Sequence, residues 1–480
     1  MDVLSGSSYG KIVTPEIGIS DKATLNVRVG ENALSSGSIR LTLIDADTFR
    51  VGMPAELRIA EVGVMGFDPE TYVENFTNIV VGDRYKLTFV EAGVYDLALN
   101  KTERENVREK GGNQTEQGVA GALIDVGGFG SDTPMRGVAD RINNLSQDPS
   151  RQREYFDALG ALAPSGSDVT GTNAVSNTAQ LFNAISGRFD GSFGRNFALN
   201  GVNNRGMSAG EKVVGKSAIW GQMLYNQANL KDRGSVRGFD SDSSGIALGF
   251  ETNLNDNLKV GTGLSYTSTE VDVINKNNDI NTYGWFGYGK YQFAKLFNET
   301  YASYGFSRYD ETRNVAGSNV YAKYNSESLA VKSLIGTDFD FYGFYVTPKA
   351  GLQYMAILSD GFIDSVGQKV GDSSSDIITA VSEVKIEKGF KINETVDVLP
   401  NVKLGLSYDI KNDSNNSVVS LANGSSYTSY GMALKRTEFM SGLGAKFEIG
   451  DDVEVSVDYI GKFREDFTDN TGMITAKYKF

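Results

Sequence analysis

Residues 453–459 read Val453-Glu454-Val455-Ser456-Val457-Asp458-Tyr459, with an apolar residue at every second position. Successive side chains of a strand point to opposite faces, so this stretch predicts a strand with one apolar face and one polar face. The same texture recurs at 244–254, 258–266, 346–354, 402–409 and 443–449. Alternation alone leaves two architectures open, a soluble sandwich with its apolar face inward and a membrane barrel with that face outward.

The connections between the strands favour the barrel. Tight turns are expected near 255–257, 294–295, 340–342, 393–395 and 450–451, and longer polar loops near 229–243, 270–280, 311–321, 360–374, 412–430 and 464–471. Short turns on one side, long loops on the other and an even strand count are typical of outer-membrane barrels. The sequence therefore predicts an all-β, twelve-stranded antiparallel transmembrane β-barrel over 216–480. The strands are expected at 216–228, 244–254, 258–269, 281–293, 296–310, 322–338, 343–359, 375–391, 396–411, 431–449, 452–463 and 472–480.

Composition removes several classes of function. The 480 residues include no Cys and no His, which excludes thiol nucleophiles and makes most hydrolase triads and zinc sites improbable. We therefore expect no enzyme activity, no metal and no cofactor. A net charge of −14 disfavours a nucleic-acid partner, since such proteins need a basic surface to displace phosphate counterions. The high Gly and Tyr content with few Pro suits a β-rich protein.

No run of the sequence approaches the 18 apolar residues of a transmembrane helix. The N-terminal residues 1–6 lack the basic and apolar regions of a signal peptide. Because an outer-membrane protein needs one, we expect this chain to be a fragment or the tail of a longer precursor.

Two further zones precede the predicted barrel. Residues 1–100 carry short alternating runs, for which we prefer the last rungs of a parallel β-helix over a small sandwich. Residues 101–215 are expected to hold a polar linker and helices, including one near 173–190 made of small and amide residues. This helix lacks the broad apolar stripe of a core helix and suits a polar barrel lumen, although a surface helix remains an alternative. Its candidate pore-plug residues are Asn177, Gln180, Asn183 and Arg188.

Two stretches carry a resemblance to a known family. The first runs from Ala218-Ile219-Trp220-Gly221-Gln222 through Gly245-Ile246-Ala247-Leu248-Gly249 to Leu264-Ser265-Tyr266. The second runs from Tyr459-Ile460-Gly461-Lys462-Phe463 to the terminal Phe480. They resemble the opening strands and the closing hairpin of autotransporters, the family of type V secretion. The resemblance covers 216–480 and extends weakly to the helix near 173–190.

The resemblance implies a location and a function. The barrel would sit in the bacterial outer membrane with its short turns in the periplasm, and the segment before the first strand would run through the pore. The upstream passenger, of which residues 1–100 would be the end, would be exported to the cell surface. The expected partners are outer-membrane lipid, the barrel assembly machinery, periplasmic chaperones and the chain's own passenger, around a monomeric barrel. The terminal alternation ending in Tyr478 and Phe480 is the expected assembly signal.

Charged residues of the predicted inner face are candidate pore residues. Carboxylates among them could pair with Arg188, Arg195 or Arg205 of the plug, or could remain solvated pore charges. The set comprises Glu299, Asp338, Lys349, Lys403, Glu448, Glu454 and Asp458.

Some members of the resembled family cut their passenger at an Asn-Asn bond. Asn203-Asn204 is a weak candidate here because the surrounding family motif is missing. Two other functions stay open. One is a porin or adhesin barrel without export, and the other is a soluble β-rich enzyme, which the strand lengths and the absence of His and Cys disfavour.

Overall fold

A computed structural model describes most of the chain. The described residues are 2–5, 8–9, 12–20, 24–26, 28–29, 39–52, 57–61, 78–80, 85–91, 95–101, 103–123, 129–130, 133–165, 169–186, 217–232, 237–431 and 433–480. They belong to two compact units, Met1–Ile124 and Asp125–Phe480, which are described separately.

The described strands of the first unit form three sheets, the largest of which is mixed and has five strands. β6 pairs in parallel with β3 and antiparallel with β7 and β10, and β10 pairs antiparallel with β9. The prediction of a parallel β-helix is therefore wrong, because β6–β7 and β9–β10 are antiparallel neighbours rather than stacked parallel rungs. The strands are β1 (Asp2–Ser5), β2 (Ser8–Tyr9), β3 (Ile12–Ser20), β4 (Thr24–Asn26), β5 (Arg28–Val29), β6 (Ile39–Gly52), β7 (Leu57–Glu61), β8 (Asn78–Val80), β9 (Tyr85–Glu91) and β10 (Tyr95–Lys101).

Two helices follow in the same unit, α2 (Glu103–Glu109) and α3 (Gln114–Ala122). Asn113 caps α3. Its side chain accepts from the Glu116 N–H at 2.9 Å, and the Glu116 carboxylate accepts from the Asn113 N–H at 2.8 Å. This reciprocal capping fixes where the helix begins.

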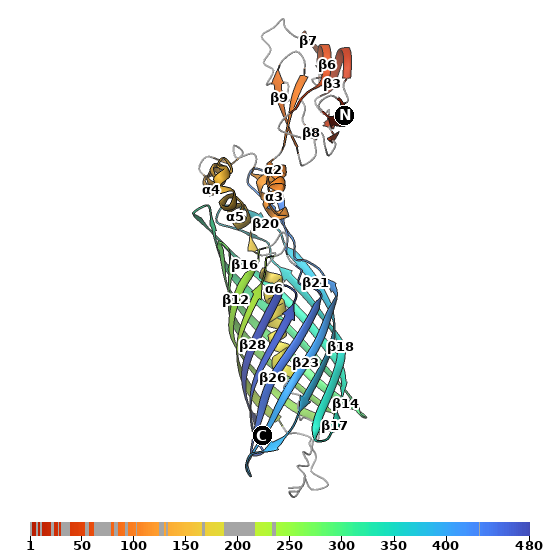
Figure 1. Ribbon diagram of the computed structural model, residues 1–480, viewed down its shortest axis with the longest axis vertical. Coiled ribbons are helices and arrows are strands. Elements are labelled where there is room, and N and C mark those ends of the chain that lie inside the picture. Colours follow the sequence, from red (N-terminus) through yellow and green to blue (C-terminus); the bar gives the residue numbers. More distant parts are fainter. Residues whose placement is uncertain are drawn as a thin grey trace. The chain divides into compact units, whose positions relative to one another are not determined.

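The second unit is a closed antiparallel barrel of twelve long strands, as the sequence predicted (Figure 1). Each strand pairs with its neighbour in sequence. The ring closes where β11 pairs with β28, from Ala218↔Lys479 to Leu230↔Phe467. The strands are β11 (Ser217–Leu230), β12 (Phe239–Asn255), β13 (Leu258–Val273), β14 (Lys276–Phe293), β15 (Leu296–Val315), β16 (Ser318–Thr337), β18 (Phe344–Ser359), β21 (Ser373–Glu387), β23 (Val396–Asn412), β26 (Thr437–Ile449), β27 (Val453–Arg464) and β28 (Phe467–Lys479).

The connections differ from the prediction on one side. The expected loops at 270–280, 311–321 and 464–471 are instead strand ends joined by the two-residue turns 274–275, 316–317 and 465–466. Ala316 and Gly317 both have positive φ, at 49° and 79°, which is the backbone of a type I′ hairpin turn. Of the other loops expected at this end, 360–372 and 413–436 remain long, and the one expected at 229–243 is shortened to 231–238.

Short additional strands lie at both ends of the barrel. The two long connections form a small sheet of β19 (Phe362–Ile363), β20 (Lys369–Val370), β24 (Ser417–Ser420) and β25 (Ser426–Ser429). We call this the loop end of the barrel. At the opposite end, called the turn end, β17 (Phe339–Phe341) pairs antiparallel with β18, and β22 (Phe390–Lys391) pairs antiparallel with β23.

The two faces of the barrel wall differ in polarity. On β11, Trp220, Gln222 and Asn226 are buried inside, whereas Ile219 and Met223 are 53% and 68% exposed outside. The same outward apolar pattern continues on neighbouring strands, for example at Leu248 and Leu264. Contiguous apolar surface of this extent is what a lipid-facing wall requires.

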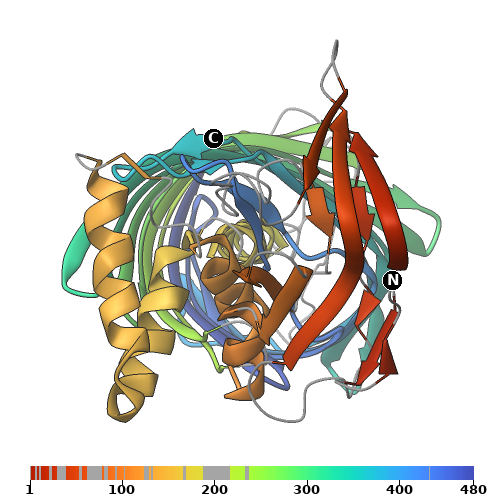
Figure 2. The same cartoon turned by 90° about the horizontal axis from the view of Figure 1, so that it is seen from above.

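The remaining helices of this unit precede the barrel strands. They are α4 (Pro134–Ser146), the 3-10 turn η2 (Pro149–Arg151), α5 (Gln152–Leu162) and α6 (Val169–Ser186). Viewed along the barrel, α6 lies inside the ring of strands (Figure 2). Among the described helices, none is long and apolar enough to cross a membrane.

Candidate functional site: the barrel lumen and its helix

The helix α6 occupies the lumen because its residues are small or amide-bearing. Its 18 residues read VTGTNAVSNTAQLFNAIS, and most of them are buried. A helix of large side chains would not fit beside the inward-facing residues of a twelve-stranded wall. The few large apolar residues, Leu181, Phe182 and Ile185, lie near its C-terminal end.

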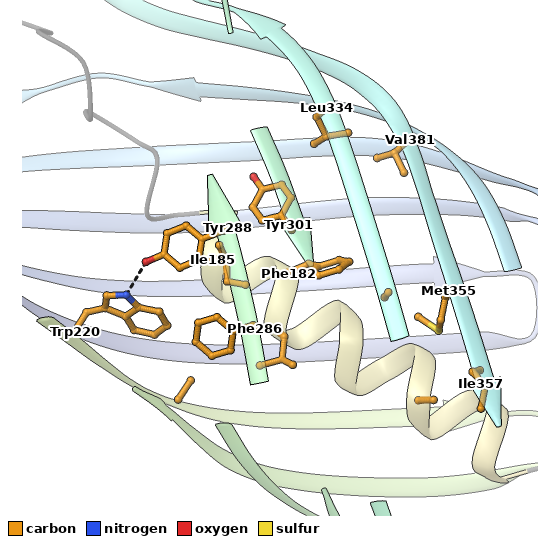
Figure 3. Packing of buried hydrophobic residues seen from close by; sticks show 14 residues of the cluster. Phe182, Ile185, Trp220, Phe286, Tyr288, Tyr301, Leu334, Met355, Ile357 and Val381 are labelled. Carbon is orange, nitrogen blue, oxygen red and sulfur yellow. Dashed lines mark hydrogen bonds between the residues drawn. The ribbon is translucent and has the colours of Figure 1, made fainter. Parts of the chain in front are cut away.

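These apolar residues dock α6 against one side of the wall. Phe182 and Ile185 pack with Trp220, Tyr301 and other buried residues in a single cluster (Figure 3). The Phe182 and Tyr301 ring centroids are 5.8 Å apart. The Trp220 indole N–H donates to the Tyr288 hydroxyl at 2.8 Å, so the polar atom of the buried indole is satisfied. The contact therefore combines apolar burial with a fixed ring arrangement.

Polar side chains of α6 bind the wall at the level of its middle turns. Asn177 donates to the Thr282 hydroxyl at 3.1 Å, and Ser176 donates to the Asp469 carboxylate at 2.6 Å. Asn226 of β11 donates to the same Asp469 at 2.7 Å. Because these groups are buried, each hydrogen bond avoids the cost of a desolvated polar atom and fixes the register of the helix in the lumen.

The helix does not fill the lumen completely and leaves a crevice between itself and part of the wall. Gly171, Val175, Ala179 and Asn183 of α6 form one wall of this crevice, and residues of β16, β18, β21, β23, β26 and β27 form the other. Charged residues of both signs line the barrel side, namely Lys332, Glu383, Asp409, Asp413, Glu438, Lys462 and Arg464. The crevice is thus lined by both charged and apolar side chains, with Met355 and Val381 among the apolar ones.

The plug residues predicted from the sequence take different positions. Asn177 and Gln180 are buried, and the Gln180 amide donates to the Ser176 hydroxyl at 3.2 Å. Asn183 is half-buried and lines the crevice. Arg188 lies outside the described residues, as do Arg195, Arg205, Asn203 and Asn204.

Several of the predicted pore charges form ion pairs on the inner wall, two of them across an intervening strand. Glu299 contacts Lys290 at 3.3 Å and Lys349 at 3.1 Å. Lys403 contacts Asp458 at 3.4 Å. The paired Glu299 and Lys349 are buried on the inner face of the wall.

Two more predicted carboxylates lie near the turn end. Glu448 contacts Lys446 at 2.8 Å, and Glu454 contacts Lys477 at 3.1 Å. Asp338 differs from the rest, because it is exposed in the connection between β16 and β17, where the Thr347 hydroxyl donates to it at 2.6 Å. Asp338 is therefore a rim residue.

A buried cluster of charged residues at the loop end was not predicted from the sequence. Arg313 is fully buried, forms ion pairs with Asp364 and Glu311, and donates to the carbonyl of Leu162 at the end of α5. The Ser165 N–H donates to the Glu311 carboxylate at 2.9 Å. The cluster thus ties the segment between α5 and α6 to β15 and to the connection 360–372.

Other contacts also hold α5 and the segment after it at the loop end. The Lys276 ammonium donates to the Ala163 carbonyl at 2.8 Å, and Arg237 forms an ion pair with Asp157 of α5 at 2.8 Å. Tyr427 of β25 accepts from the Gln368 side chain at 3.1 Å, and burial raises the pKa of its hydroxyl. Asp364 lies 51 residues from Arg313 in the sequence, so no local pattern indicates that the two side chains pair.

The C-terminus completes the closing strand. Phe480 and Ser217 exchange two backbone hydrogen bonds of 3.0 and 2.8 Å. Tyr478 and Phe480 are exposed on the outer face, with ring centroids 6.3 Å apart. Among the described residues, no group of three or more His, Cys, Asp or Glu side chains is placed to hold a metal ion.

Comparison with known proteins identifies the barrel. Residues 219–460 match the model of the autotransporter beta-domain. The chain belongs to the autotransporter family. The barrel accordingly lies in the bacterial outer membrane and is a type V secretion translocator domain.

A solved structure shares the fold, and two curated relatives are similar in sequence over part of their length. The translocator domain of the autotransporter NalP from Neisseria meningitidis has the same fold, with a TM-score of 0.52 and 13% identity over 66% of this chain and 99% of that one. Outer membrane protein A of Rickettsia rickettsii is 25% identical over 307 residues, which are 59% of this chain and 13% of that protein. Outer membrane protein B of Rickettsia prowazekii (strain Madrid E) is 20% identical over 362 residues, 70% of this chain and 22% of that protein. The chain thus spans less than a quarter of either relative.

Proposed function

We propose that this autotransporter barrel exports the N-terminal part of its own chain to the cell surface and is then closed by α6. The observation that carries the proposal is the direction of α6. Val169 packs with Leu230 and Phe239 at the loop end, whereas Ile185 packs near Trp220, whose strand β11 begins at the turn end. The chain upstream of α6 therefore leaves the barrel at the loop end, opposite to the end where β11 begins.

This path is the one that export requires. A twelve-stranded barrel admits a helix or an extended chain but no folded domain, so a passenger must cross unfolded and fold outside. With the turn end in the periplasm, residues before Val169 stand outside the cell. In this proposal Asn177, Gln180 and Asn183 belong to the plug, and the paired charges Glu299, Lys349, Lys403, Glu448, Glu454 and Asp458 keep the wall polar for the passing chain.

Lipid and the chain's own passenger are the partners that follow from the family. We propose in addition that periplasmic chaperones and the barrel assembly machinery deliver a monomeric barrel, with Tyr478 and Phe480 as the signal. Passenger cleavage at Asn203–Asn204 stays a prediction from the sequence.

The absence of Cys makes a topology test direct. Gln147 follows α4, and Asp451 lies in the turn between β26 and β27; both are exposed. A membrane-impermeant maleimide should label Gln147→Cys in intact cells, and Asp451→Cys only after the outer membrane is permeabilised. Labelling of Asp451→Cys alone in intact cells would contradict the proposed direction of export.

The second candidate is a barrel that conducts solutes, and the charged crevice beside α6 favours it. Single-channel conductance of the full chain and of a chain starting at residue 217 separates the two functions. The export proposal expects a nearly closed full chain and an open truncated barrel. Equal conductance of both would favour a porin.

A further inference from the structure

The outer wall of the barrel carries a shallow apolar groove across β16, β18, β21 and β23. One row of paired residues crosses it, in the order Ile335, Ala350, Ser382, Leu406 and Phe439. Ala350 and Ser382 are small and form the floor, while the larger side chains rise on both sides.

A lysine lies toward the turn end from this groove. Lys388 directly follows β21, and its ammonium sits 4.4 Å from the ring centroid of Phe344 and 5.7 Å from that of Phe390. Among the residues that the structure describes, no carboxylate forms an ion pair with Lys388. A cation held against aromatic faces keeps its charge available for an external anion.

The surroundings of Lys388 are those of a membrane interface. Phe339, Phe341, Tyr342 and Phe344 of the β17–β18 hairpin are all exposed, and Tyr342 is 86% exposed. Aromatic side chains of this kind prefer the headgroup level of a bilayer. The hairpin thus places Lys388 at the depth where lipid phosphates lie.

The spacing between the lysine and the groove matches one lipid molecule. Val384, which lines the groove, precedes Lys388 by four residues on the same outward face of the chain. At about 3.3 Å per residue this is roughly 13 Å along the strand. One leaflet of the hydrocarbon core is about 15 Å deep, so an acyl chain anchored near Lys388 would reach the groove.

We propose that this face binds one anionic phospholipid. Its phosphate pairs with the Lys388 ammonium between Phe344 and Phe390, and an acyl chain lies over Ala350 and Ser382. The proposal depends on membrane insertion alone and is independent of passenger export.

The test uses the full chain reconstituted into nanodiscs of phosphatidylglycerol and phosphatidylethanolamine and then released for native mass spectrometry. The wild-type barrel should retain one phosphatidylglycerol in preference to phosphatidylethanolamine. Lys388→Ala should weaken that retention about tenfold, equivalent to about 1.4 kcal/mol. Lys388→Arg should preserve it, since the charge and the ring contact remain.

Two further variants separate the contribution of the lipid headgroup from that of the acyl chain. Ala350→Trp fills the groove on the lipid-facing side and should reduce retention of both lipids. Lys295→Ala removes an exposed lysine from the turn between β14 and β15 and should change nothing. Equal retention by wild type and Lys388→Ala, or an equal loss in Lys295→Ala, would overturn the site. Heat-dependent migration on gels verifies that each variant is folded.

Discussion

Replacing Phe182 by Ala should release α6 from the barrel wall. Phe182 is 3% exposed and packs on Tyr301, which is fully buried. Truncating a core Phe costs about 3–5 kcal/mol, because the apolar contact is lost and a cavity remains. Each 1.4 kcal/mol is a factor of ten in an equilibrium. The population with α6 undocked should therefore rise about a hundredfold to a few thousandfold.

Planar-bilayer recording of single barrels measures this population as open time. The matched control is Asn183→Ala, on the same helix but half-buried in the crevice, which should change open time little. A Phe182→Ala barrel that stays as closed as wild type, while the truncated barrel opens, would refute the assignment of the apolar cluster as the lock.

Three other changes test the wall and the contacts at the loop end. The chain has two Trp, so brominated lipid should quench the half-exposed outer Trp285 in a Trp220→Phe variant and leave Trp220 unquenched in a Trp285→Phe variant. Arg313→Met leaves two buried carboxylates without a cation and should lower stability by about 3–5 kcal/mol, opening the loop end to protease. Its control is Lys323→Ala, an exposed ion pair worth under about 1 kcal/mol. Glu251→Leu removes the carboxylate between two buried lysines, so the barrel should unfold at a lower temperature in heat-modifiability gels.

The barrel could be predicted from the sequence because its outer face meets lipid on nearly every strand. Alternation at residues such as Leu248 and Leu264 repeats with period two wherever the wall is in the membrane. At 270–280 and 311–321 the strands continue, but their outward residues are polar, such as Glu270 and Asp279, and apolar residues such as Val271, Ile280 and Val315 point inward. The strand ends were therefore predicted as loops, although the backbone pairing continues through them.

The lumen could be predicted only in outline. The small and amide residues of α6 indicated a polar surrounding, and its residues do contact the wall. The Arg313 cluster depends on pairing between segments far apart in sequence, and the crevice beside α6 depends on which side Phe182 packs. The strand pairing of the first unit was predicted wrongly for the same reason, because short alternating runs do not specify parallel or antiparallel partners.

The seam of the barrel has a consequence for how the ring is made. Gln222 and Thr475 meet across it although 253 residues separate them, and each doubling of a closing loop costs about 0.6 kcal/mol. Ser176 donates to Asp469 on one edge, while Asn226 on the other edge donates to the same carboxylate. Because α6 binds residues on one of the two paired edge strands, its docking favours the closed ring. A barrel with α6 docked should therefore resist separation of β11 from β28 more than an empty barrel does. The free energy by which docked α6 stabilises the closed seam then equals the free energy by which the closed seam stabilises docking of α6.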